Sequence, residues 1–164
     1  FQQGGTFFTT FANAPAARLY GAEVEVQRYF LLDRFSQAPF FAGRRAVAIA
    51  NGTWSQSAIR VADGDTTIPV GTNGLPVPAS NLFVDGEPMT GQSEHLVNLQ
   101  LGLENTDRLS QQTILLTYSS ERVSNRGLGQ QPDLIEEPGL QLDFVAREGV
   151  RLFGAEAELK LEAR

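Results

Sequence analysis

Cysteine is absent from the 164 residues of this chain. Disulfide frameworks, thiolate metal sites and thiol nucleophiles are therefore excluded together. The chain also lacks any run of the roughly 18 to 20 consecutive apolar residues that a transmembrane helix requires. Transmembrane strands need only about 9 to 11 residues and present half of them to lipid. A membrane protein built from strands is therefore still compatible with the sequence.

Acidic residues outnumber basic ones, which are dispersed along the sequence, and no leader pattern is recognised near the start. The chain has 13 Lys and Arg against 19 Asp and Glu, and its net charge is -6. A phosphate-binding surface needs clustered basic residues, so we expect no nucleic-acid partner. The chain opens with Phe1, and no basic segment followed by an apolar run and a small-residue cleavage site stands near the start. These features predict an internal fragment or a processed product.

Alternation of apolar and polar residues is the clearest pattern present. In Ala155–Arg164, alanine and leucine hold the odd positions and charged residues the even ones. In a strand the two sets lie on opposite faces, whereas a helix would scatter both around its circumference. Similar patterns and β-forming composition predict seven strands and no helix: Thr6–Ala12, Ala17–Arg28, Arg45–Ser57, His95–Glu104, Gln112–Val123, Leu140–Arg147 and Ala155–Arg164.

The predicted connections differ in length. Short turns are expected at Asn105–Leu109, which is polar, and at Arg147–Arg151, which includes a glycine suited to a tight hairpin. Ile59–Gly91 and Ser124–Gly139 are long and rich in glycine, proline and polar residues. Short turns at one end and long loops at the other are typical of an outer-membrane barrel, with strands apolar outside and polar inside.

A soluble sandwich also alternates, with its apolar face against a second sheet. Three features favour the barrel. The polar faces carry Glu, Gln, Asn and Ser, as a wet lumen would, and the apolar faces include many Ala and Gly, which fill a sandwich core poorly. Aromatic residues could form interfacial girdles; they are Tyr20, Trp54, Tyr118 and Phe144.

Several residues could in principle act in catalysis or bind a metal ion, but a purely structural role explains each of them better. Pairs of carboxylates can hydrolyse glycosides. Residues two apart on a strand share a face because of the pleat, so such spacing needs no catalytic purpose. The carboxylate groups are Glu23 with Glu25, Glu136 with Glu137, and Glu156 with Glu158 and Glu162. A Ser-His-Asp arrangement would have to use His95, because it is the only histidine, but a surface or rim position at the start of a strand is favoured. Asp63, Asp65 and Asp85 lack the density of a calcium loop. No phosphate cradle is predicted from the loop glycines Gly4, Gly5, Gly71, Gly74, Gly127 and Gly129.

Several motifs resemble those of TonB-dependent outer-membrane receptors, in the right order over most of the chain. The first two matches are fairly specific. They are NAPAARLYGAEVEVQRY at Asn13–Tyr29 and MTGQSEHLVNLQLG at Met89–Gly102. The others resemble a late strand, its following loop and the closing strands of that family: ILLTYSSERV at 114–123, PDLIEEP at 132–138, QLDF at 141–144 and ELKLEAR at 158–164.

The resemblance implies an all-β, antiparallel up-and-down transmembrane β-barrel, of which residues 1–164 would supply about seven strands as one partial domain. The family pattern would continue past Arg164, and its N-terminal plug is not among these residues. The implied function is uptake of a scarce small molecule, such as a metal chelate or ferric siderophore, across the outer membrane of a Gram-negative bacterium. The implied partners are membrane lipid and the TonB energy-coupling complex. Ligand contact is expected in Ile59–Gly91, because long loops on a rigid scaffold carry recognition.

No catalytic, cofactor-binding or metal-binding residue is expected, and the protein is not predicted to be an enzyme. Two other hypotheses are a soluble all-β binding or adhesin module built as a sandwich and a carbohydrate-active enzyme with two carboxylates across a cleft. An isolated partial barrel would expose two sheet edges and an apolar surface, so we expect such a fragment to aggregate.

Overall fold

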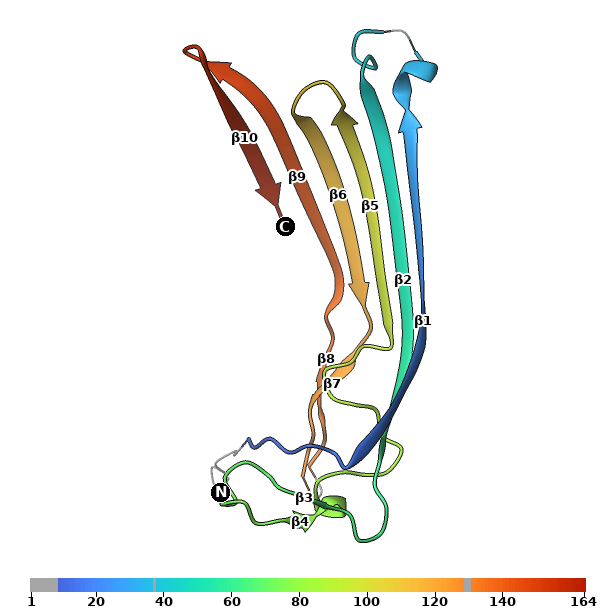
Figure 1. Cartoon of the computed structure of the whole chain (residues 1–164), viewed down its shortest axis with the longest axis vertical. Coiled ribbons are helices and arrows are strands. Elements are labelled where there is room, and N and C mark those ends of the chain that lie inside the picture. The colour runs from blue at the N-terminus through green and yellow to red at the C-terminus, as the bar shows by residue number, and fades with distance from the viewer. Residues whose placement is uncertain (1–8, 37, 129–130) are drawn as a thin grey trace, which may run out of the picture. The chain divides into compact units, whose positions relative to one another are not determined.

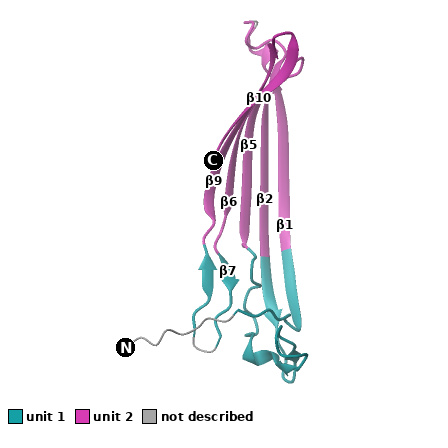
Figure 2. Cartoon of the chain, turned by 90° about the vertical axis from the view of Figure 1, so that its left-hand side faces the viewer, with its two compact units in different colours: residues 1–20, 56–92, 122–136 teal, residues 21–55, 93–121, 137–164 magenta. Residues whose placement is uncertain are grey.

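The computed structural model describes residues 9–36, 38–128 and 131–164. Within them the chain is built from antiparallel β-structure, and its helical segments are two three-residue 3₁₀ turns. None of these helical segments has the length and apolar character needed to span a membrane. The described residues fall into two compact units (Figure 2). Unit 1 contains residues 9–20, 56–92, 122–128 and 131–136, and unit 2 contains the remainder.

The main sheet has six strands that are neighbours in their order along the chain (Figure 1). The sheet order is β1-β2-β5-β6-β9-β10. This is an up-and-down meander, and β1 and β10 are its edge strands in the described chain. The bounds are β1 Ala16–Leu31, β2 Arg44–Arg60, β5 His95–Asn105, β6 Ser110–Ser119, β9 Gly139–Leu152 and β10 Ala155–Ala163.

Six of the seven predicted strands are confirmed, and the all-β prediction with them. Two boundaries are wrong. The strand predicted to end at Arg147 continues to Leu152. Gln112–Val123 is divided after Ser119, where β6 ends, and Arg122–Asn125 forms the separate strand β7. Backbone bonds explain the break. Ser120 N donates to His95 O (3.0 Å), and Gly91 N donates to Val123 O (2.8 Å), so the chain changes partner between these two residues.

The alternation of apolar and polar residues along each strand determines which residues lie on each face of the sheet. Directly paired residues of neighbouring strands share a face. Leu101 pairs with Ala48 on β2 and with Ile114 on β6. On β1, the odd positions share the face of Asn51, because Glu23 accepts a hydrogen bond from the Asn51 amide (2.7 Å). One face therefore holds the even positions of β1, β2, β6 and β9 and the odd positions of β5 and β10.

The β5–β6 turn and the longer β1–β2 connection lie at one end of the sheet, which we call the turn end. The predicted turn at Asn105–Leu109 is confirmed: Asn105 Oδ1 accepts from the backbone N–H groups of Asp107 (2.9 Å) and Arg108 (3.1 Å), an Asx turn. The β1–β2 connection, which contains the 3₁₀ turn η1 (Leu32–Arg34), also lies at this end, because Arg44 pairs with Asn105. The opposite end of the sheet, where β5 begins, is the loop end.

The hairpin turn predicted at Arg147–Arg151 is wrong. Strand β9 continues through Gly149 to Leu152, which pairs directly with Ala155. The turn is Phe153-Gly154, and both residues have positive φ, 51° and 85°. Two residues of positive φ between paired strands form a type I′ turn, a conformation that a bulky residue adopts at a cost.

We expect Phe153→Asn to stabilise this hairpin by about 1 kcal/mol, because Asn tolerates the left-handed region better than Phe. Phe153 is fully exposed, so no packing is lost. The measurement is the free energy of unfolding of the protein in denaturant. Phe153→Ala is the control, since it removes the ring but keeps the strain. A gain as large for Ala as for Asn would contradict this account.

Unit 1 contains the remaining short elements. They are β3 (Thr66–Thr67), β4 (Val77–Pro78), η2 (Ala79–Asn81), β7 and β8 (Leu134–Glu136); β3 pairs with β4 and β7 with β8. The long connections predicted at Ile59–Gly91 and Ser124–Gly139 therefore carry short strands of their own. The strand predicted at Thr6–Ala12 is wrong for residues 9–12, which are irregular, and residues 6–8 lie outside the described residues.

Candidate functional site

One face of the six-stranded sheet is apolar from β1 to β10, and we call it the apolar face. The rows of cross-strand neighbours run without interruption. One row is Ala48, Leu101, Ile114, Phe144 and Ala163, and the next is Ala50, Leu99, Leu116 and Leu142. On the edge strand β1 the same face carries Ala22, Val24 and Val26. The alternation of six strands thus produces one continuous surface.

This surface is uncovered in the described chain. Leu142 is 58% exposed and Leu159 is 64% exposed, and the buried apolar residues of the described chain are only Val47, Ile59, Pro69 and Ala79. With about 4.8 Å between strands and 3.3 Å per residue, the five strands from β1 to β9 cover roughly 600 Å² over eight residues. Strand β10 adds the residues that pair with Phe144 and Ala146. The largest apolar patch on a typical soluble monomer is about 300–600 Å², so a face of this size marks an interaction surface.

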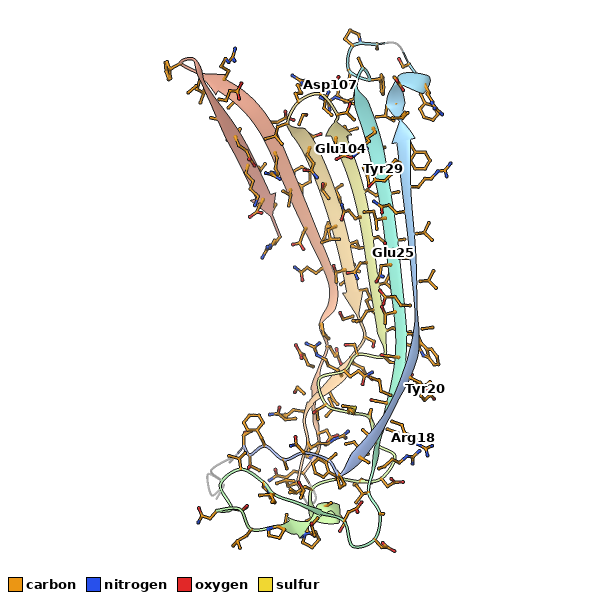
Figure 3. The ribbon with its side chains drawn as sticks, in the orientation of Figure 1. Arg18, Tyr20, Glu25, Tyr29, Glu104 and Asp107 are labelled. Atoms are coloured by element: carbon orange, nitrogen blue, oxygen red, sulfur yellow. The ribbon has the colours of Figure 1, made fainter. Side chains whose placement is uncertain are left out.

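The opposite face, which we call the polar face, carries charged and amide side chains in pairs. Arg147 binds Glu158 through two nitrogens (2.6 and 3.1 Å), and Lys160 binds Glu162 (2.6 Å). Arg45 bonds to Glu104 and lies over the Tyr29 ring (4.6 Å to its centroid). Figure 3 shows Tyr29 and Glu104 near one another at the turn end, and Tyr20 and Glu25 on opposite sides of β1.

Polar residues return to the apolar face at the turn end. Glu148 lies one row beyond Ala146 and pairs with Ser110 on β6. Its carboxylate accepts from the Ser110 hydroxyl (2.7 Å) and the Gln112 amide (2.6 Å), and Ser110 is 1% exposed. The Glu148 carboxylate thus has two hydrogen-bond donors, which compensate for its place on the apolar face. Its row is the border of the apolar rows at the turn end.

Aromatic residues gather toward the loop end of the same face. Trp54 pairs with His95, and Tyr118 pairs with Val97 one row nearer the turn end. The Tyr20 hydroxyl donates to Gln56. Phe144 differs from the other aromatic residues singled out in the sequence, because it lies inside the apolar rows beside Ile114.

Arg126 holds together the loops of unit 1, and no motif or spacing in the sequence singles it out. Its guanidinium binds Glu87 (2.9 Å) and Asp133 (2.6 Å) and also donates to the Pro88 carbonyl. Asp133 accepts a second hydrogen bond from Gly127 N (2.9 Å). The Arg126 side chain is only 11% exposed. One arginine therefore ties the connection after β2 to the connection between β7 and β8.

A cavity of about 260 Å³ lies beside this cluster, within unit 1. Arg126 lines it, and the Nε of that residue is buried without a hydrogen-bond partner. The walls combine hydroxyl and amide side chains with aromatic and aliphatic ones: Thr9, Thr10, Phe11, Leu82, Phe83, Thr90, Ser124, Asn125, Leu128 and Gln131. A cavity with this lining can bind a small group that has both polar and apolar parts.

The three loop aspartates are not assembled into a metal site. Asp65 accepts a hydrogen bond from Ala62 N (2.8 Å), and Asp85 accepts from Val61 N (3.0 Å) and pairs with Arg60 (3.3 Å). These bonds shape the loop. Asp63 is exposed. Among the described residues no group of three or more His, Asp or Glu side chains could hold a metal ion.

The histidine and the carboxylate pairs lie where strand geometry puts them. His95 is exposed at the first position of β5. Glu156, Glu158 and Glu162 share the polar face and bond to neighbouring basic residues, whereas Glu136 pairs with Arg122 across β7 and β8 (2.8 Å). The hydrogen bond from Arg122 lowers the pKa of the Glu136 carboxyl. The β7–β8 pairing is therefore favoured at neutral pH and weakens as the pH falls through that pKa.

The loop glycines that the structure describes occupy backbone positions that other residues fit poorly. Gly71 and Gly74 have φ of 95° and 80°. A Cβ on Gly127 would lie 2.1 Å from the Gln131 carbonyl oxygen, so only glycine fits there. Gly4, Gly5 and Gly129 lie outside the described residues.

Comparisons with known proteins do not extend this description. No protein-family model, no curated protein and no solved structure matches the chain. Function must therefore be inferred from the two faces of the sheet, from the residues of unit 1 and from the motifs in the sequence.

Proposed function

We propose that this chain is part of the barrel wall of a TonB-dependent receptor in the outer membrane of a Gram-negative bacterium. In this proposal the apolar face meets lipid and the polar face lines the lumen. The receptor takes up a scarce small molecule, such as a ferric siderophore, with energy from the TonB complex. The protein binds and transports its ligand and performs no covalent chemistry.

The observation that carries the proposal is the uncovered apolar face of a six-stranded up-and-down sheet. From Ala46 to Trp54 this face spans eight residues, or about 26 Å along the strand. At a tilt of about 40° the band would be about 20 Å high, close to the apolar band of roughly 25 Å on outer-membrane barrels. Trp54, Tyr20 and Tyr118 then lie where an aromatic girdle is expected.

The family assignment is supported by the motifs rather than by the fold. The NAP step at Asn13–Pro15 directly precedes β1, and the segment VNLQLG at 97–102 lies within β5. Each matched segment therefore leads into a strand or lies within one, whereas the strand that the resemblance implies before NAP is irregular over residues 9–12. The long connections belong to unit 1. The cavity beside Arg126 is slightly smaller than pockets for drug-sized ligands, so we assign it to part of a ligand.

Lipid contact can be tested residue by residue, because the chain has no cysteine. Single cysteines placed along β5 from Leu96 to Leu103 in the full-length protein would carry nitroxide labels in lipid vesicles. We expect labels at Val97, Leu99 and Leu101 to be reached by oxygen, which partitions into lipid. Labels at Asn98 and Gln100 should instead be reached by a water-soluble nickel chelate.

The soluble sandwich makes a different prediction. A second layer would cover the apolar face, so oxygen and nickel would both be excluded from the odd positions. Equal access of the nickel chelate to both sets would mean that both faces meet water. Either result would reject the barrel proposal, whereas a period of two in oxygen access supports it.

A further inference from the structure

Basic residues gather at the turn end of the sheet, in the segment 28–45 that joins β1 to β2. This segment holds four arginines and one aspartate, a net charge of +3 in a chain of net charge -6. Arg45 is bonded to Glu104 on the polar face. The other three, Arg28, Arg34 and Arg44, form no hydrogen bond or ion pair through their side chains with the described residues.

Two of these arginines stand on the apolar face. Arg28 and Arg44 hold even positions on β1 and β2, as Val26 and Ala46 do. The guanidinium carbon of Arg44 lies 4.4 Å from the centroid of the Phe40 ring. A guanidinium over an aromatic ring keeps N–H donors in its own plane, and these donors can bind an oxyanion.

Exposed aromatic side chains accompany these arginines. Phe30 follows Arg28 on the same face and is 42% exposed, while Phe40 is 55% exposed and Phe35 is 75% exposed. Phe40 also packs edge-on against Phe41, with 5.2 Å between ring centroids. Arginine beside exposed aromatic rings, directly after an apolar band, is the composition of a membrane interface, where rings enter the headgroup region and cations meet lipid phosphates.

Given the proposed barrel, we propose that this border binds the phosphate of anionic phospholipids in the leaflet at the turn end. Arg28 and Arg44 bind the headgroup, and the rings of Phe30 and Phe40 anchor the site at the acyl boundary. The site is an outward lipid-binding surface, separate from the lumen and from the cavity in unit 1.

Neighbouring acidic groups leave the site positive. Asp33 lies on the same connection, and Asp107 lies on the β5–β6 turn close to Gly43. Arg34 and Arg108 follow these two aspartates in sequence and offset their charges. Glu148 is three strands from β2, about 14 Å by strand spacing, and it is bonded to Ser110 and Gln112. At physiological salt a charge at that distance is largely screened.

The test uses the full-length protein in phosphatidylcholine vesicles that contain some phosphatidylglycerol. A bimane fluorophore on Ala42→Cys reports on nearby lipid, and a nitroxide is carried either by the phosphatidylglycerol or by the phosphatidylcholine. We expect phosphatidylglycerol to be enriched around the fluorophore, by about fivefold for each arginine. The double variant Arg28→Gln with Arg44→Gln should return the surroundings to the bulk composition.

The matched control is Arg18→Gln, which changes an arginine on the same face of β1 near the loop end. It should leave the enrichment unchanged, and a loss equal to that of the double variant overturns the proposal. Inorganic phosphate, added at constant ionic strength, separates a lipid site from a site for free phosphate. If it abolishes the enrichment, the site binds phosphate alone and the lipid assignment is wrong.

The same samples distinguish failure of this inference from failure of the proposed function. Insertion is followed independently by circular dichroism and by heat-dependent mobility on a gel. Wild-type protein that inserts but shows equal quenching by both labelled lipids overturns the lipid site and leaves the barrel intact. Wild-type protein that does not insert into any vesicle overturns both.

Discussion

Leu142→Arg is expected to destabilise the full-length protein in lipid by about 2–4 kcal/mol if the apolar face meets lipid as proposed, because an arginine near the bilayer midplane on the lipid face of a barrel has this cost. Leu142 pairs with Leu116 in the middle row of the apolar face. Because Leu142 is already 58% exposed, little packing within the chain is lost on substitution. The measurement is the free energy of unfolding in denaturant, with protein folded into vesicles.

The matched control for this variant is Gln141→Arg, one residue earlier on β9 and on the polar face. Gln141 lies near Asp143 (3.1 Å between side-chain atoms), so the new arginine gains a carboxylate partner and should change stability by less than about 0.5 kcal/mol. A Leu142→Arg effect as small as that of the control would mean that the apolar face meets water. The barrel proposal would then be wrong.

Strand positions were largely predictable from sequence because alternation is a local property. The predicted His95–Glu104 differs from β5 by one residue, and Ala155–Arg164 from β10 by one residue. All six strands alternate with a period of two residues. Once they pair in one sheet, their apolar residues can therefore lie on a single face. The continuous apolar face was therefore implied by the sequence, whereas its exposure on one uncovered sheet required the structure.

The turns were less predictable, because conformation there depends on neighbours distant in sequence. Gly149 suggested a hairpin at Arg147–Arg151 but lies inside β9. Its N–H donates to Leu109 O (2.7 Å), and a Cβ at this position would lie 3.2 Å from the Leu109 Cβ. The glycine allows close approach of the β5–β6 turn. Phe153 gave no turn signal, because bulky residues rarely take positive φ.

The cluster around Arg126 could not be found from sequence for a related reason. Glu87 lies 39 positions before it, and neither residue belongs to a motif. Loop ion pairs have no periodicity that a single sequence reveals. The motifs pointed to long loops as the place of recognition, but not to the arginine that connects two of them.

Arg126→Ala is expected to lower the local stability of unit 1 by about 3 kcal/mol, because removal of one partner leaves Glu87 and Asp133 without their shared cation. Hydrogen exchange of the full-length protein should show amide protection falling about a hundredfold in residues 86–91 and 122–128. If the cavity beside Arg126 holds part of the ligand, uptake should fall as well.

The control for this variant is Arg151→Ala, whose ion pair with Glu156 (3.4 Å) is largely exposed on both sides. Exposed pairs contribute less than about 1 kcal/mol, so exchange should change little. Arg126→Lys keeps the positive charge but lacks the planar fork of donors that bonds to two carboxylates and a carbonyl at once. We expect its loss of amide protection to lie between those of the wild type and Arg126→Ala. Protection in Arg126→Ala equal to that of the wild type would show that the connections are held by their backbone bonds alone, including that from Gly91 N to Val123 O.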